Sequence, residues 1–178
     1  MKTITFSNTK GGVGKTTASI HTGAGLAMRG YKVLLVDADP QAHATFTLGI
    51  PKEPCLHDLM VRNAPFAEMV RPIDPERYTT PDTKPKGSFF IIPSNVETRS
   101  ITNQIEDVFL FQNRLLELEG QIDVVIIDTS PTPSMLHGSI FLASDYIVYP
   151  TACELLALEG LGQSMAQRQN ASKARVSM

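Results

Sequence analysis

Short apolar runs rich in β-branched residues recur along the chain and predict five strands. They lie at Thr3–Ser7, Lys32–Val36, Phe89–Ile92, Val124–Ile127 and Tyr146–Tyr149. Stretches with helical periodicity lie between them. Strands that alternate with helices are typical of parallel βαβ units, so the pattern predicts an α/β fold: an open, mostly parallel sheet with helices on both faces. The run at 124–127 is apolar throughout, which is typical of a central buried strand.

The helical stretches differ in clarity. Lys15 to Arg29 predicts a helix that ends at Gly30. Cys55 to Val70 predicts one amphipathic helix, and the apolar residues on its shared side are Leu56, Leu59, Met60 and Ala67. Residues 51–88 carry seven of the twelve prolines, so we expect the rest of that region to be a surface loop.

The strongest chemical signal lies between the first strand and the first helix. Residues 10–17 read Lys-Gly-Gly-Val-Gly-Lys-Thr-Thr. Glycines let backbone N–H groups surround phosphates, and strand, loop and helix form the context that a P-loop requires. Lys15 would reach the β- and γ-phosphates as a point charge, and the Thr16 hydroxyl would bind a magnesium ion.

This P-loop departs from the standard pattern. Thr9 stands where that pattern has glycine, and Lys10 adds a second lysine at the mouth of the loop. A glycine-rich turn with a solvated lysine is the alternative interpretation, and the flanking strand and helix favour the nucleotide site. The predicted nucleotide-binding residues are Lys10, Gly11, Gly12, Val13, Gly14, Lys15, Thr16 and Thr17.

Three carboxylates follow predicted strands. Asp37 and Asp39 come after the strand at 32–36, and residues two apart on an extended chain point the same way. Ligands bind at the carboxyl ends of strands in open α/β sheets, where a carboxylate can order a magnesium-bound water or the attacking water. A capped turn is the alternative. Asp128 ends the strand at 124–127 in the Walker B arrangement, in which the aspartate holds magnesium.

Together these motifs resemble the ParA/MinD family of deviant Walker A ATPases, which have a P-loop NTPase fold. Lys10–Thr17 resembles the deviant Walker A motif, and Asp37-Ala-Asp-Pro-Gln followed by Ala-x-Ala-Thr resembles switch I of the ParA/Soj branch. The Asp123–Asp128 strand resembles Walker B. The family continues Asp-Thr-Pro-Pro, whereas this chain reads Asp-Thr-Ser-Pro-Thr-Pro, so the contacts of the following loop stay open. Glu154–Gly160 resembles the start of the next helix.

The resemblance implies roles for these residues. ATP or ADP and Mg²⁺ would be the cofactors, and Lys10, Lys15 and Asp39 would form the catalytic set. Lys10 would reach the partner's ATP across a dimer, and Asp39 would orient the attacking water. Asp37 would lie near the magnesium shell, beside Thr16 and Asp128.

The resemblance also implies a function. The chain would be a single P-loop ATPase domain, residues 1–178, shortened at its C-terminus relative to the family. It would bind and hydrolyse ATP as an ATP-bridged homodimer in plasmid or chromosome segregation, with a ParB-like centromere-binding partner and non-specific DNA. A MinD-like or protein-cargo positioning ATPase and a nucleotide-binding module without turnover remain alternatives. The cargo, the adenine contacts and the DNA-binding surface stay open.

Composition adds mainly exclusions. A formal net charge of −2 gives no global signal for nucleic acid or anionic membrane. The apolar runs are too short to span a bilayer, and a P-loop at residue 10 leaves no room for a signal peptide, so we expect a cytoplasmic protein. Association with the nucleoid stays open. The tail residues Arg168, Lys173 and Arg175 would be solvated or would contact phosphates.

Cysteine and histidine give no metal signal. Cys55 and Cys153 are far apart and form no CxxC motif, so we expect free thiols and no iron–sulfur cluster. The four histidines show no metal-ligand spacing and are expected to be surface or hydrogen-bonded side chains. They are His21, His43, His57 and His137.

Overall fold

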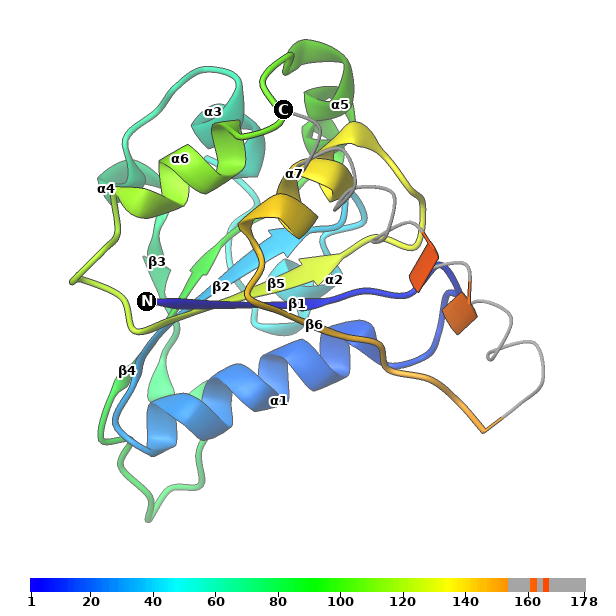
Figure 1. Cartoon of the computed structure of the whole chain (residues 1–178). Helices are drawn as coiled ribbons and strands as arrows, with labels where there is room; N and C mark the ends of the chain where they lie inside the picture. The colour runs from blue at the N-terminus through cyan, green and yellow to red at the C-terminus, as the bar shows by residue number, and fades with distance from the viewer. Residues whose placement is uncertain (154–160, 163–164, 167–178) are drawn as a thin grey trace.

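A computed structural model of the chain describes residues 1–153, 161–162 and 165–166. In these residues six strands form one sheet in the order β3-β4-β2-β5-β1-β6 (Figure 1). The strands are β1 (Lys2–Phe6), β2 (Lys32–Ala38), β3 (Arg71–Pro72), β4 (Ser88–Ile92), β5 (Val124–Thr129) and β6 (Tyr146–Val148). All neighbours are parallel except β3, which pairs antiparallel with β4.

Helices cover both faces of the sheet (Figure 1). One face carries α1 (Lys15–Met28) and α2 (His43–Thr47), whose apolar residues share a core cluster. The other face carries α3 (Leu56–Met60), α4 (Phe66–Met69), α5 (Ile101–Gln104), α6 (Leu110–Leu116) and α7 (Met135–Ala143). Two 3₁₀ turns, η1 (Pro75–Arg77) and η2 (Val96–Ser100), lie in the connections. The predicted fold class is confirmed.

The central strands are buried on both sides, which explains their continuous apolar sequence. In β2, Leu34 and Val36 belong to the cluster under α3–α7, whereas Val33 and Leu35 belong to the cluster under α1. The strand β5 divides in the same way between the two clusters. Alternate residues of a strand point to opposite faces, so a strand covered on both faces needs apolar residues at every position.

Two expectations for residues 51–88 are wrong. The single helix over 55–70 is two short helices, α3 and α4, because Pro65 lacks a backbone N–H and disfavours helical backbone at the residue before it. Asn63 adopts a left-handed φ of 53° in the break. The changed phase exposes Ala67 and buries Phe66 and Met69 instead. The expected surface loop also contains the short edge strand β3.

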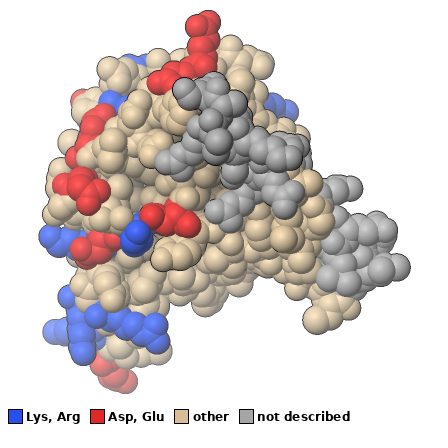
Figure 2. Space-filling model, in the orientation of Figure 1, with Lys and Arg blue, Asp and Glu red and all other residues tan. Residues whose placement is uncertain are grey.

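On the face shown in Figure 2, charged side chains of both signs lie mainly along the left side and the upper edge, with a small basic group at the lower left. This agrees with a net charge near zero. No helix in the described part of the chain is long and apolar enough to cross a membrane. The resemblance at Glu154–Gly160 and the tail cations at 168, 173 and 175 lie outside the described residues.

Candidate nucleotide-binding site

The loop between β1 and α1 uses backbone that favours glycine. Gly12 has a φ of 73° and Gly14 a φ of 86°, both in the left-handed region. A Cβ at Gly11, Gly12 or Gly14 would meet no other atom within 4 Å, so all three positions face open space. Gly14 precedes α1 without a side-chain cap, which leaves the first N–H groups of α1 available to an anion.

Asn8 anchors this loop to the sheet. Its Oδ1 accepts a 3.0 Å hydrogen bond from the backbone N–H of Lys10, and its Nδ2 donates a 2.9 Å bond to the Pro150 carbonyl after β6. The side chain is buried. Nothing in the sequence pointed to this role, because the bond to Pro150 joins residues 142 positions apart.

Lys15 is the first residue of α1 and is only 7% exposed. Its Nζ donates a 3.3 Å hydrogen bond to the Lys10 carbonyl. Burial lowers the pKa of Lys15, while the nearby charges of Asp128 and Asp39 raise it. A partly desolvated ammonium at a helix N-terminus is well suited to bind phosphate.

The three predicted carboxylates meet at the carboxyl ends of β2 and β5. Asp37 and Asp128 are paired in the register of these strands, and Asp39 follows in the loop after β2. Asp37 is fully buried and accepts three hydrogen bonds, from Thr45 N (2.8 Å), Thr45 Oγ1 (2.7 Å) and Asp39 N (3.2 Å). Burial raises its pKa to about 6 in spite of these bonds.

Asp128 is also fully buried, but neither carboxylate oxygen has a hydrogen-bond partner in the described part of the chain. Burial raises its pKa to about 7, and the charges of Asp37 and Asp39 add to this effect. The nearby Thr16 hydroxyl and Lys15 ammonium lower the pKa of Asp128, although neither forms a hydrogen bond of good geometry with its oxygens. Such an orphaned buried carboxylate is suited to a cation.

The donor set fits magnesium bound together with a phosphate. No group of three His, Cys, Asp or Glu side chains suited to hold a metal occurs among the described residues. Mg²⁺, however, usually takes one or two protein ligands and completes its shell with waters and substrate phosphates. Asp128 and the nearby Thr16 hydroxyl supply that kind of partial shell, and Asp37 uses its oxygens on the protein.

Asp39 occupies a tight turn. Its Oδ1 accepts a 2.9 Å bond from Gln41 N, and its carbonyl accepts bonds from Ala42 N (2.8 Å) and Ser94 Oγ (2.7 Å). Ser94 follows β4, and its N–H donates to Thr45 Oγ1 at 3.0 Å. Thr45 and Ser94 therefore tie Asp37 to Asp39 through buried hydroxyl groups. Thr45 belongs to the Ala-x-Ala-Thr motif, whereas nothing in the sequence marks Ser94.

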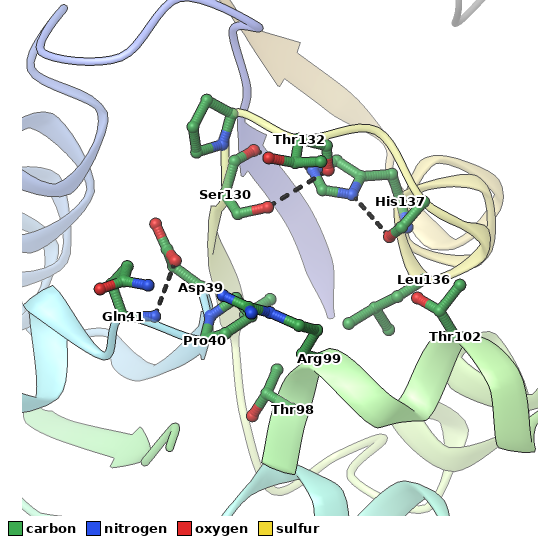
Figure 3. Close-up of a pocket in the computed structure, with 13 residues that line it drawn as sticks. Asp39, Pro40, Gln41, Thr98, Arg99, Thr102, Ser130, Thr132, Leu136 and His137 are labelled. Carbon is green, nitrogen blue, oxygen red and sulfur yellow. Dashed lines mark hydrogen bonds between the residues drawn. The ribbon is translucent and has the colours of Figure 1, made fainter. Parts of the chain in front are cut away.

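A pocket of about 370 Å³ opens beside Asp39 (Figure 3). The Asp39–Gln41 turn forms one side, and the loop from Ser130 to Ser134 that joins β5 to α7 forms the other. Thr98, Arg99 and Thr102 complete the wall. The pocket thus separates the two loops that follow the predicted carboxylates Asp37 and Asp128.

Among the histidines, His137 lies nearest to the site. It is buried, and its ring contacts the Ser130 carbonyl and the Ser134 hydroxyl. The expectation of a hydrogen-bonded histidine holds for it, but its position beside the loop after Asp128 was not predicted. The Ser-x-x-His spacing at a helix start was the available signal. The described Cys55 and Cys153 are free, as expected.

The parallel sheet, the glycine loop and the strand-end aspartates define a P-loop NTPase fold. A family model described as AAA domain, AAA_31, matches residues 1–177. The chain is 37% identical over 169 residues to the sporulation initiation inhibitor protein Soj of Bacillus subtilis, covering 91% of this chain and 62% of that protein. It is 34% identical over 164 residues to the chromosome-partitioning ATPase Soj of Treponema pallidum, covering 90% and 60%.

The fold also matches a solved structure. Cobyrinic acid a,c-diamide synthase from Mycobacterium smegmatis, with bound ADP and magnesium, superposes with a TM-score of 0.84 at 27% identity, over 97% of this chain and 69% of that chain. The protein belongs to this AAA domain family and, within it, to the ParA/Soj branch. It spans about three fifths of the length of the two Soj relatives.

Proposed function

We propose that residues 1–178 form one P-loop ATPase domain that binds and hydrolyses Mg²⁺-ATP. The orphaned carboxylate of Asp128 carries this proposal. It is fully buried, it has no hydrogen-bond partner among the described residues, and the charge of Lys15 acts on it. Burying an unpaired carboxylate costs folding free energy, so a ligand that pairs with it is the simplest physical reason for its presence.

The chain's own residues divide the work. The loop at Gly11–Gly14 and the start of α1 would surround the phosphates, and Lys15 would pair with the β- and γ-phosphates. Val13 and Thr17 complete the proposed nucleotide set. Bound Mg²⁺ would neutralise phosphate charge, with Asp128 and Thr16 as its protein contacts.

Asp39 is the proposed hydrolytic residue. Its Oδ2 accepts no hydrogen bond in the described part of the chain, whereas its Oδ1 is held by Gln41 N. One oxygen therefore fixes the carboxylate and the other is available to orient a water. Asp37 would support the Asp39 turn without contacting the nucleotide. Its Oδ1 accepts a bond from Asp39 N, and its Oδ2 accepts bonds from Thr45 N and Oγ1.

The names of the relatives favour partition as the cellular role. One relative is a chromosome-partitioning ATPase. We propose that ATP bridges two copies of this chain through Lys10, that a ParB-like partner stimulates hydrolysis, and that non-specific DNA is the surface on which the dimer acts. A cytoplasmic, nucleoid-associated protein follows from this role.

The decisive experiment is ATP hydrolysis by the purified chain with and without Mg²⁺, DNA and a ParB-like protein from the same source. We expect slow turnover that requires Mg²⁺ and rises when DNA and partner are both present. Asp39→Ala serves as the blank for contaminating activity. Nucleotide binding with no turnover above that blank under any condition would identify a binding module and overturn the ATPase proposal.

A further inference from the structure

We propose that His137 is a positioning residue for hydrolysis, which holds the loop between β5 and α7 against the pocket beside Asp39. The inference rests on the proposed ATPase function and names a residue to which neither the P-loop nor the aspartate motifs assign a role. His137 lies on the first turn of α7, and its ring reaches back to the loop that begins two residues after Asp128 (Figure 3).

The loop needs an external support. Of its five residues, Pro131 and Pro133 have no backbone N–H, so the loop has fewer donors than an ordinary turn. The side-chain bond inside it is long, 3.3 Å from Ser130 Oγ to the Thr132 carbonyl. His137 provides the shorter contact, 2.9 Å from its Nε2 to the Ser130 carbonyl.

Hydrogen bonding fixes the form of the ring. A carbonyl only accepts, so Nε2 of His137 carries the proton and donates to Ser130. Nδ1 then accepts from the Ser134 hydroxyl at 3.0 Å, and Ser134 Oγ in turn accepts from the His137 backbone N–H at 3.4 Å. Every donor and acceptor of the neutral ring is used. One imidazole thus connects both ends of the loop.

The surroundings keep the ring neutral and in place. His137 is 7% exposed, and Phe141 packs edge-on against it with ring centroids 6.2 Å apart. Burial lowers the pKa of His137, and the positive charge of Lys15 lowers it further, whereas the Ser130 carbonyl and the charge of Asp39 raise it. A buried neutral ring held at both nitrogens has little freedom to turn.

The consequence falls on turnover more than on nucleotide binding. Ser130 and His137 line the same pocket as Asp39, so the bond from His137 sets how the β5–α7 loop faces the proposed hydrolytic residue. The phosphate-binding loop is held separately, through Asn8. A loosened β5–α7 loop should therefore lower kcat and leave the affinity for ATP nearly unchanged.

Four variants test the bond. His137→Leu removes the ring's hydrogen bonds to Ser130 and Ser134. His137→Asn places an amide only at the Nδ1 position, so neither of these two variants bonds to the Ser130 carbonyl. His137→Gln places an amide N–H at the Nε2 position and can restore that bond. Phe141→Leu is the matched control, because it removes the ring contact and keeps both hydrogen bonds.

We expect kcat for Mg²⁺-ATP to fall about 10-fold or more in the Leu and Asn variants, with the dissociation constant for ATP within about 2-fold of the wild type. His137→Gln should recover most of kcat, and Phe141→Leu should keep it. The proposal is overturned if His137→Leu keeps wild-type kcat. It is also overturned if His137→Gln is as slow as His137→Leu, or if Phe141→Leu loses as much kcat.

A second readout separates this proposal from the proposed function. Hydrogen–deuterium exchange of peptides covering 129–138 and 8–18 is measured in the same variants, without nucleotide. We expect faster exchange only in the 129–138 peptides of the Leu and Asn variants. If the wild type hydrolyses no ATP, the proposed function fails, and the exchange data still test whether His137 holds the loop. Unchanged exchange of the 129–138 peptides in His137→Leu would show that His137 does not hold the loop.

Discussion

Asp37 and Asp128 are register partners on the adjacent parallel strands β2 and β5, yet their surroundings are opposite. Asp37 accepts three hydrogen bonds from its own chain, whereas no described residue bonds to either oxygen of Asp128. Both are fully buried. One carboxylate is therefore built into the fold, and the other is the one that we propose for a ligand.

This contrast predicts that Asp128 destabilises the ligand-free protein at neutral pH. Its pKa is raised from an ordinary 3.8 to about 7, so the folded state binds more protons than the unfolded state between these values. The contribution of this group to the free energy of unfolding is therefore fully present below about pH 4 and is lost as pH rises through about 7. Asp128→Asn should be about 1–3 kcal/mol more stable than the wild type at pH 8, after the cost of a buried unpaired amide.

Denaturant unfolding in EDTA at pH 5 and pH 8 measures this difference. The advantage of Asp128→Asn should shrink at pH 5, where the wild-type carboxyl is already protonated in the folded state. Asp37→Asn is the matched control and should be less stable than Asp128→Asn at pH 8. Its NH2 group must face either the Asp39 N–H or the Thr45 donors, and all of these groups donate. Equal stability of the two variants at pH 8 would contradict the assigned contrast.

Lys15→Ala is expected to abolish nucleotide binding and to leave the fold intact. The ammonium makes one 3.3 Å bond to a loop carbonyl, and burial lowers its pKa, so its removal costs the fold little. Titration with a fluorescent ATP analogue, beside circular dichroism, checks both parts. Lys52→Ala, at an exposed lysine, serves as the control. Unchanged ATP affinity in a folded Lys15→Ala protein would remove the P-loop assignment.

Asp39→Ala is expected to bind ATP and to hydrolyse it about 100-fold or more slowly, because the carboxylate would act on the attacking water. The turn itself should persist. Its bonds from Ala42 and Ser94 go to the Asp39 carbonyl, which the substitution keeps. Single-turnover hydrolysis and a binding titration separate the two effects, with Asp82→Ala as an exposed control. Wild-type turnover would exclude Asp39 from the mechanism.

The parts of this site that the sequence predicted are those encoded by neighbouring residues. Glycines at fixed spacing determine the loop before α1, and an aspartate directly after an apolar strand lies at the edge where ligands bind. The parallel sheet followed from strands alternating with helices. Local patterns therefore placed Lys15, Asp37 and Asp128 before any contact was known.

The supports of the site were not predictable in this way. Ser94 reaches Thr45 from 49 residues away, and its position depends on β4 lying beside β2. His137 contacts Ser130 only because the first turn of α7 folds back over the loop. A single proline, Pro65, also outweighed the apolar periodicity that had predicted one helix over 55–70. Bonds between distant residues and local backbone limits decided these features.

Lys10 provides the sharpest test of the dimer. Its backbone already serves the loop, since its N–H donates to Asn8 and its carbonyl accepts from Lys15. A Lys10→Ala protein keeps these backbone bonds and loses the side chain with its ammonium. If that charge acts on the partner's phosphates, as an arginine finger would, the variant should bind ATP as a monomer nearly as well as the wild type. It should lose ATP-dependent dimerisation and stimulated hydrolysis together.

Light scattering with and without ATP, beside a binding titration, measures both effects. Lys10→Arg is the matched variant, because it keeps a positive charge at the same position and should retain part of the dimerisation. Lys52→Ala again controls for the loss of one surface charge. Normal ATP-dependent dimerisation of Lys10→Ala would exclude the bridging role. A wild-type chain that stays monomeric in every nucleotide state would instead identify a monomeric nucleotide-binding module, with Lys10 acting only at the mouth of its own loop.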